Sequence, residues 1–317
     1  MHLNGARSLW PAAKHLHKSL QNKVIDMFEF MTKKKWLTVL AIILIITVLR
    51  TMIQPLIPDD GSNPLPKSWF VSSGLMPIAF IIYGLVMLGL LALVFVAIQS
   101  LLPGKKLRKG ATFGIAFGGL WFVYLLELLP HAPWQLPSSL FYPIVDGITI
   151  ALLGLLLGRF VAADSESHNA VANRLSIALT AIPAMFLIGR LINYNIFHIY
   201  SLYSTRPIET LLWVVIMGTW ISIMYTLLQP STSSKSLLAK AIFFGLIVFG
   251  INIFLNDMFM PIPFTLNIWG IGAFSYEDMI LRTGVDILSV TAGVCVYEIL
   301  YNMASSPPST KGSNIKT

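Results

Sequence analysis

The apolar residues of this chain lie in long continuous runs, and most polar residues lie between the runs. A membrane-spanning helix needs about 20 residues, because each residue advances 1.5 Å through a hydrocarbon core of about 30 Å. The runs do not alternate with the period of two that a membrane β-barrel requires. The pattern predicts eight spanning helices, near residues 36–54, 75–101, 110–130, 141–160, 175–196, 208–229, 238–258 and 279–303.

The composition supports this interpretation. Hydrophobic residues make up 56% of the chain and charged residues only 11%, against about 25% in soluble proteins. We therefore expect an all-α, polytopic integral membrane protein. The single cysteine, Cys295, excludes a disulfide within the chain. The net charge of +8 arises beside apolar runs, which favours contact with anionic lipid over a nucleic-acid partner.

The distribution of basic residues predicts the orientation of the helices. With a cytoplasmic N-terminus, almost all of the 22 lysines and arginines fall on the cytoplasmic side or within the spans. The opposite side holds only Lys67 and Arg206. Cytoplasmic loops of membrane proteins carry such an excess of basic residues. We expect a multi-pass protein of the cell (inner) membrane with both termini in the cytoplasm.

Two terminal segments lie outside the predicted bundle. Residues 1–35 are basic, and their apolar residues recur every three or four positions, which predicts a helix lying on the cytoplasmic membrane surface. The alternative is that residues 1–30 are a dispensable extension before Met31. Residues 304–317 are rich in serine, proline, glycine and lysine, a composition typical of a disordered tail.

The two halves of the chain resemble each other. Residues 36–160 and 175–303 each contain four predicted spans, and the fourth span of each contains Val-Asp followed by a hydroxyl residue and a glycine. The aspartates are Asp146 and Asp286. Because four is an even number, both halves insert in the same direction, and we expect two tandem (parallel) four-helix repeats. The alternative is a chance similarity between apolar segments.

Charged residues inside the spans are the candidate site. A charge at the bilayer centre costs about 2.5–3.5 kcal/mol on insertion scales, so such residues pair or face a polar cavity. The rise per residue places one arginine and one aspartate of each half at matching depth below the outer surface. We predict the ion pairs Arg50–Asp146 and Arg190–Asp286. Further candidates for the same polar cluster are Glu127, Asp257 and Arg282.

Three roles are open for these charges. They are structural clasps between helices, arginines that extend to the outer headgroups, or an outward-opening polar cavity for an ion, proton or small anion. The planar guanidinium favours an anionic ligand. No span contains a visible break, which argues against a transporter built on discontinuous helices. Glycines at regular spacing predict close helix packing, namely Gly114, Gly118, Gly119, Gly147, Gly154 and Gly158.

The sequence contains no phosphate loop, zinc-protease motif, nucleophile elbow or dinucleotide fingerprint, and we predict neither metal nor cofactor. Three function classes remain. The first is a non-catalytic membrane subunit or scaffold, with a membrane-protein partner or a second copy of the chain. The second is a small-solute or ion transporter with an outward-opening polar site. The third is an intramembrane enzyme in which Asp146 and Asp286 meet. The sequence places the first narrowly before the second and favours a non-enzymatic role.

Overall fold

The computed structural model describes residues 31–53, 56, 72–128, 136–164, 175–199, 201–229, 236–259 and 276–305, and their regular structure is helical. Of the two terminal segments predicted at residues 1–35 and 304–317, residues 1–30 and 306–317 lie outside this description, whereas α2 begins at Lys33 and α12 ends at Ser305. Seven of the predicted runs form one helix each, namely α2 (Lys33–Ile53), α4 (Met76–Ile98), α5 (Lys106–Leu125), α6 (Leu136–Phe160), α7 (Leu175–Asn195), α8 (Pro207–Leu228) and α12 (Tyr276–Ser305).

The remaining run, predicted at 238–258, is a continuous helix that alternates between α-helical and π-helical hydrogen bonding. It passes through α9 (Leu237–Ile242), the π-helix η5 (Phe243–Phe249), α10 (Gly250–Phe254) and the π-helix η6 (Leu255–Phe259). We call this element the seventh span. A π-helix widens the turn and often marks a functional position. The run is continuous from Leu237 to Phe259, and its π-helical turns are a change of hydrogen-bonding pattern that the sequence analysis did not predict.

Within the described residues, seven helical segments are long and apolar enough to cross a membrane, namely α2, α4, α6, α7, α8, the seventh span and α12. These segments make the chain a polytopic helical membrane protein. Helix α5 is not among them, because its first turn is basic and four glycines lower its hydropathy. The η2 turn (Leu126–Leu128) follows it directly.

Helices α5 and α6 pack with their backbones in contact. A Cβ placed on Gly154 would lie 2.6 Å from the Gly110 carbonyl oxygen, and one on Gly118 would lie 2.5 Å from that of Gly147. A Cβ on Gly158 would lie 2.6 Å from the Cα of Gly110. Only glycine permits this approach, which confirms the predicted packing role of the regularly spaced glycines.

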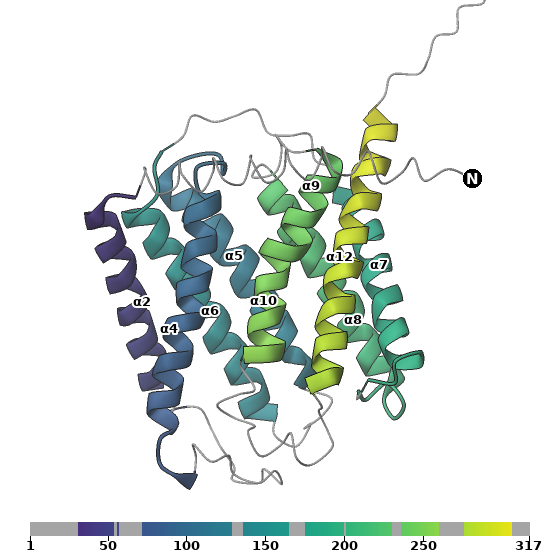
Figure 1. Ribbon diagram of the computed structural model, residues 1–317, viewed down its shortest axis with the longest axis horizontal. Helices are drawn as coiled ribbons and strands as arrows, with labels where there is room; N and C mark the ends of the chain where they lie inside the picture. The colour runs from purple at the N-terminus through teal and green to yellow at the C-terminus, as the bar shows by residue number, and fades with distance from the viewer. Residues whose placement is uncertain are drawn as a thin grey trace, which may run out of the picture.

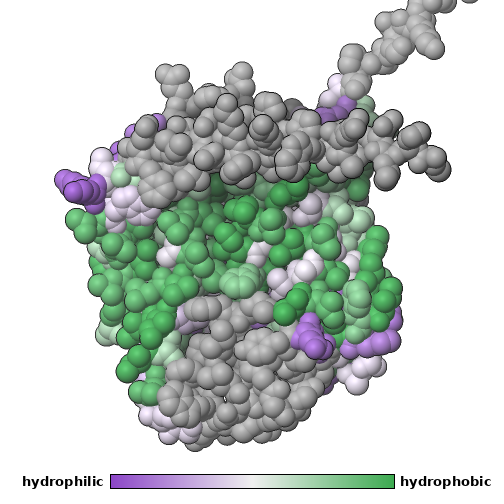
Figure 2. Space-filling model, viewed as in Figure 1, coloured by the Kyte–Doolittle hydropathy of each residue, from purple (hydrophilic) through white to green (hydrophobic). Residues whose placement is uncertain are grey.

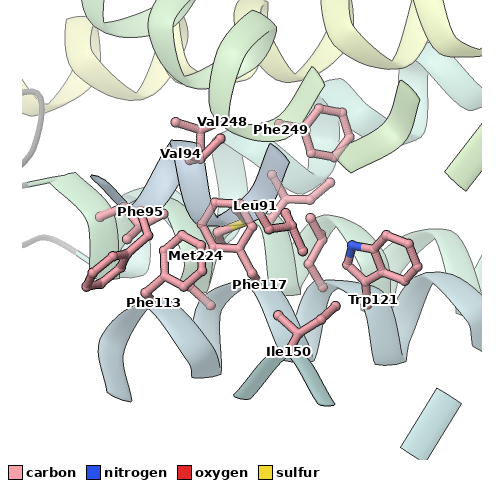
Figure 3. Packing of buried hydrophobic residues seen from close by; sticks show 14 of the residues in the cluster. Leu91, Val94, Phe95, Phe113, Phe117, Trp121, Ile150, Met224, Val248 and Phe249 are labelled. Carbon is pink, nitrogen blue, oxygen red and sulfur yellow. The ribbon is translucent and has the colours of Figure 1, made fainter. Parts of the chain in front are cut away.

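A continuous apolar core joins the two halves of the chain. Figure 3 shows Phe95 of α4, Phe117 of α5, Met224 of α8 and Phe249 of η5 gathered in one cluster. Buried indole groups add hydrogen bonds across the same junction. Three of them run from Trp121 Nε1 to Asn252 Oδ1, from Trp213 Nε1 to the Val123 carbonyl and from Trp220 Nε1 to the Ala116 carbonyl.

The helices run up and down between two ends of the bundle (Figure 1). Helix α2 begins, and α12 ends, at the end that we call the basic end. A band of apolar side chains covers the visible side of the bundle between its ends (Figure 2). Exposed leucines and isoleucines on α2, such as Leu40 and Leu44, are the surface expected against lipid acyl chains.

Candidate functional site

Both predicted ion pairs are present. Arg50 Nε of α2 lies 2.5 Å from Asp146 Oδ1 of α6, and Arg190 Nη2 of α7 lies 2.6 Å from Asp286 Oδ2 of α12. Each pair joins the first helix of its half to the fourth, as the sequence predicts. Their assignment as a ligand site is a separate prediction that these contacts do not test.

The first pair is a balanced clasp. Arg50 donates a hydrogen bond to Asp146, and the two side chains are 13% and 14% exposed. One positive and one negative group neutralise each other between α2 and α6. The electrostatic neighbours of Asp146 in the described chain do not include any acidic group of the second half. Such a pair holds helices together without leaving a charge to be balanced.

The second pair belongs to a larger group of charges. Arg190 Nη1 also lies 3.6 Å from Glu127 Oε1, which is carried by the η2 turn of the first half. Arg282 Nη2 of α12 forms a short ion pair with Glu127 Oε2. Arg282 Nε lies 3.8 Å from Asp257 Oδ1 of η6. We call these five residues the central cluster. It brings together every candidate site residue except Arg50 and Asp146.

Aromatic and hydroxyl groups surround the central cluster. The Tyr124 hydroxyl donates a short hydrogen bond to Asp257 Oδ1, and Thr283 Oγ1 donates to Oδ2 at 3.0 Å. The Arg190 guanidinium lies 4.9 Å from the centre of the Trp213 ring and is 1% exposed. Such cation–π contacts, worth about 0.5–2 kcal/mol, stabilise a guanidinium away from water. Arg190 Nε and Nη2 and Arg282 Nε nevertheless have no hydrogen-bond partner among the described residues.

The central cluster carries more negative than positive groups. Among the described residues, its three carboxylates, Glu127, Asp257 and Asp286, face two guanidinium groups, so full ionisation of these five groups leaves one surplus negative charge. Asp286 is fully buried and Asp257 nearly so. A buried net charge is unfavourable, and a proton or a bound cation relieves it. The charge count favours a cationic occupant and argues against the anionic ligand suggested by the arginines alone.

Several polar atoms beside the cluster lack a hydrogen-bond partner among the described residues. They include both amide atoms of Asn193, the Tyr194 hydroxyl and Asp286 Oδ1. Asp286 Oδ2 is close to Arg190 but not aligned for a hydrogen bond. Asn193 lies three residues after Arg190 on α7 and is fully buried. Because buried polar groups are normally satisfied, these atoms indicate a place for water or a ligand.

A further ion pair was not predicted from the sequence. Lys240 Nζ of α9 lies 2.7 Å from Glu298 Oε2 of α12, and the Tyr225 hydroxyl of α8 donates to Glu298 Oε1 at 2.5 Å. We call these three residues the basic-end triad. The signal was present in the sequence, because Glu298 is an isolated acid in the apolar run from Val294 to Tyr301. Lys240 was assigned only to the basic loop charge.

The structure gives no support to a shared carboxylate site. Asp146 contacts Arg50 between α2 and α6, whereas Asp286 belongs to the central cluster, and no contact joins the two aspartates in the described part of the chain. The described residues also contain no group of three or more His, Cys, Asp or Glu side chains that could hold a metal ion.

Comparisons with protein-family models, curated proteins and solved structures gave no match to this chain.

Proposed function

We propose that this chain is a membrane transport protein whose central cluster binds a proton or a small monovalent cation. The observation that carries the proposal is the surplus of one carboxylate over the two arginines within the described part of a largely buried site. Ionisable groups of this kind inside a membrane mark ion pathways and proton relays. The unpartnered oxygen atoms of Asp286, Asn193 and Tyr194 supply acceptors for the occupant.

The position of the cluster supports the same function. Glu127 comes from the first half, whereas Arg190, Asp257, Arg282 and Asp286 come from the second. In transporters built from repeats, the site lies at the interface between the repeats. The cluster therefore occupies the place where a relative movement of the halves would open or close it. The π-helical turn η6, which carries Asp257, is a distortion of the kind found at functional sites.

The tandem repeat and the eighth span are part of the proposal. Corresponding helices make corresponding ion pairs, and the hydroxyls of Thr149 and Ser289 each bond the carbonyl four residues earlier. Helix α5 packs along α6 and contacts α8 in the bundle interior. Since α2 begins and α12 ends at the same end of the bundle, an even number of crossings fits the fold (Figure 1). We propose that α5 is the eighth crossing.

We further propose that the basic end of the bundle faces the cytoplasm of a cell whose inner membrane holds the protein. Lysines at the starts of α2, α5 and α9 lie at this end, and they include Lys33, Lys106 and Lys240. An excess of basic residues favours the cytoplasmic side, where anionic headgroups attract them. The central cluster then lies toward the outer surface.

The test uses the purified full-length chain in proteoliposomes. Proton flux is followed with a trapped pH-sensitive dye, and cation flux with radioactive sodium or rubidium. Asp286→Asn removes the surplus charge and should abolish the flux that the unaltered chain supports. Asp146→Asn is the matched control, because it makes the same chemical change in a balanced clasp and should retain flux per folded molecule. Equal flux through the Asp286→Asn variant and the unaltered chain contradicts the proposal.

The balanced Arg50–Asp146 pair favours a second function, that of a non-catalytic scaffold whose charges only join helices. A scaffold predicts no flux of any tested ion through the unaltered chain. It also predicts that Asp146→Asn and Asp286→Asn lower stability alike. The same two variants therefore distinguish the two functions.

A further inference from the structure

The basic-end triad lies on the same buried stripe of α12 as the central cluster. Asp286, Val290, Val294 and Tyr297 are fully buried, and Glu298 is almost so. This spacing of three to four residues marks one face of a helix. Twelve residues separate Asp286 from Glu298, which is about 18 Å along the helix axis. The triad therefore lies well toward the basic end, on the same face as Asp286, with the fully buried Val290 and Val294 between them.

The seventh span is tied to α12 at both ends, with opposite polarity. At the basic end Lys240 of the span pairs with Glu298 of α12. At the other end Asp257 of the span pairs with Arg282 of α12. The π-helical turns η5 and η6 lie after Lys240 along the same span. Glu298 and Asp257 thus lie at different depths between the seventh span and α12. The hydrogen-bonding pattern of the seventh span changes between these two depths.

Charge balance distinguishes the triad from the central cluster. The Lys240 ammonium neutralises Glu298, so the triad has no surplus charge. The Lys240 side chain is 17% exposed, whereas that of Glu298 is 2% exposed. A lysine with a long flexible stem can move its charge to the membrane surface at little cost, but the buried carboxylate cannot follow. Movement of Lys240 would leave the Tyr225 hydroxyl as the hydrogen-bond donor to Glu298 among the described residues.

We infer that Glu298 is a second binding position for the transported proton or monovalent cation, and that Lys240 is a tethered cation that occupies it in this structure. The inference rests on the proposed transport function. An ion leaving the central cluster reaches Glu298 only when the Lys240 ammonium moves aside, because a single carboxylate held by Tyr225 neutralises one positive charge. Lys240 thereby keeps the basic-end position closed when no ion is passing.

A merely structural ion pair makes a different prediction. Replacing a buried pair by neutral side chains of similar volume is often neutral or stabilising, so a clasp tolerates the loss of both charges. The decisive variant is therefore the double substitution Lys240→Met with Glu298→Gln. It removes both charges and retains most of the packing volume.

The experiment compares binding with flux in the full-length chain. Binding of protons is measured with an indicator dye, and binding of sodium or rubidium with the radioactive ion, in detergent. Flux is measured in proteoliposomes with the same probes, which separates a proton from a metal cation. Lys240→Met should raise flux because the competing ammonium is absent. Glu298→Gln and the double variant should abolish flux while retaining the binding that depends on Asp286.

Controls separate failure of this inference from failure of the proposed function. Lys105→Met removes an exposed positive charge at the same end and should leave flux unchanged. Flux retained in the double variant, or abolished by Lys240→Met as fully as by Glu298→Gln, overturns the inference while transport itself stands. Absence of Asp286-dependent binding in the unaltered chain overturns the proposed function. Lys240→Gln is measured beside Lys240→Met, so that misfolding of one variant does not decide the result.

Discussion

Neutralising Asp146 and Asp286, one aspartate in each half, should have different consequences for stability. Asp146→Asn removes the carboxylate that forms an ion pair with Arg50 between α2 and α6. Asp286→Asn instead takes the central cluster from one surplus negative charge to neutrality. The asparagine amide has nearly the shape of a protonated aspartic acid, and its oxygen can still lie beside the Arg190 guanidinium. The same substitution therefore breaks an ion pair in one half and removes a buried negative charge in the other.

The expected magnitudes follow from the contacts. The bond between Arg50 and Asp146 is charge-assisted, and losing such a bond costs about 1.5–3 kcal/mol. The upper range for broken buried pairs, about 3–5 kcal/mol, does not apply, because Arg50 lies near the end of α2 and can extend toward the headgroups. For Asp286→Asn the lost attraction to Arg190 and the removed surplus charge offset each other, which leaves a change within about 1 kcal/mol.

The assay is thermal unfolding of each variant in one detergent at one heating rate. A change of 1 kcal/mol moves the midpoint by about 2–4 °C in a chain of 150–250 residues, so Asp146→Asn should lower it by roughly 3–12 °C. Asp286→Asn should leave the midpoint within about 4 °C of the unaltered chain. If Asp286→Asn lowers the midpoint as much as Asp146→Asn, the central cluster holds no surplus charge and the argument for a cationic occupant is wrong.

Three further predictions concern packing and topology. Gly154→Ala should destabilise the α5–α6 contact by about 1–3 kcal/mol through overpacking, whereas Gly89→Ala, whose Cβ meets nothing within 4 Å, should be neutral or stabilising in the same thermal assay. Trp213→Phe should lower stability by about 0.5–1.5 kcal/mol through the lost hydrogen bond to α5, as measured by denaturant unfolding, and an unchanged midpoint would refute that bond. In a chain whose single cysteine is replaced by serine, Lys105→Cys and Leu128→Cys should react with an impermeant maleimide from opposite sides of the membrane, whereas labelling from one side would show that α5 does not cross.

Continuous apolar runs were sufficient to locate the helices. The predicted run at 175–196 became α7 (Leu175–Asn195), and the run at 208–229 became α8 (Pro207–Leu228). The isolated charges were equally informative, because a charge in an apolar helix needs a partner at its own depth. That constraint alone predicted that Arg50 would meet Asp146. The same rule would have found Glu298, had it been applied to every acid in the spans.

Only the tertiary structure shows which residues of the two halves contact each other. A helix in a soluble protein shows its buried face through alternation of polar and apolar positions, whereas a membrane helix is apolar toward both the core and the lipid. The sequence therefore indicates how deep each residue lies along its helix axis. It does not indicate which way the side chain faces around that axis. Only rotation and packing bring Glu127 of one half and Asp257 of the other to Arg282, and Lys240 to Glu298. The charge balance of the candidate site depends on those contacts, because it is a property of the assembled group and of no single helix.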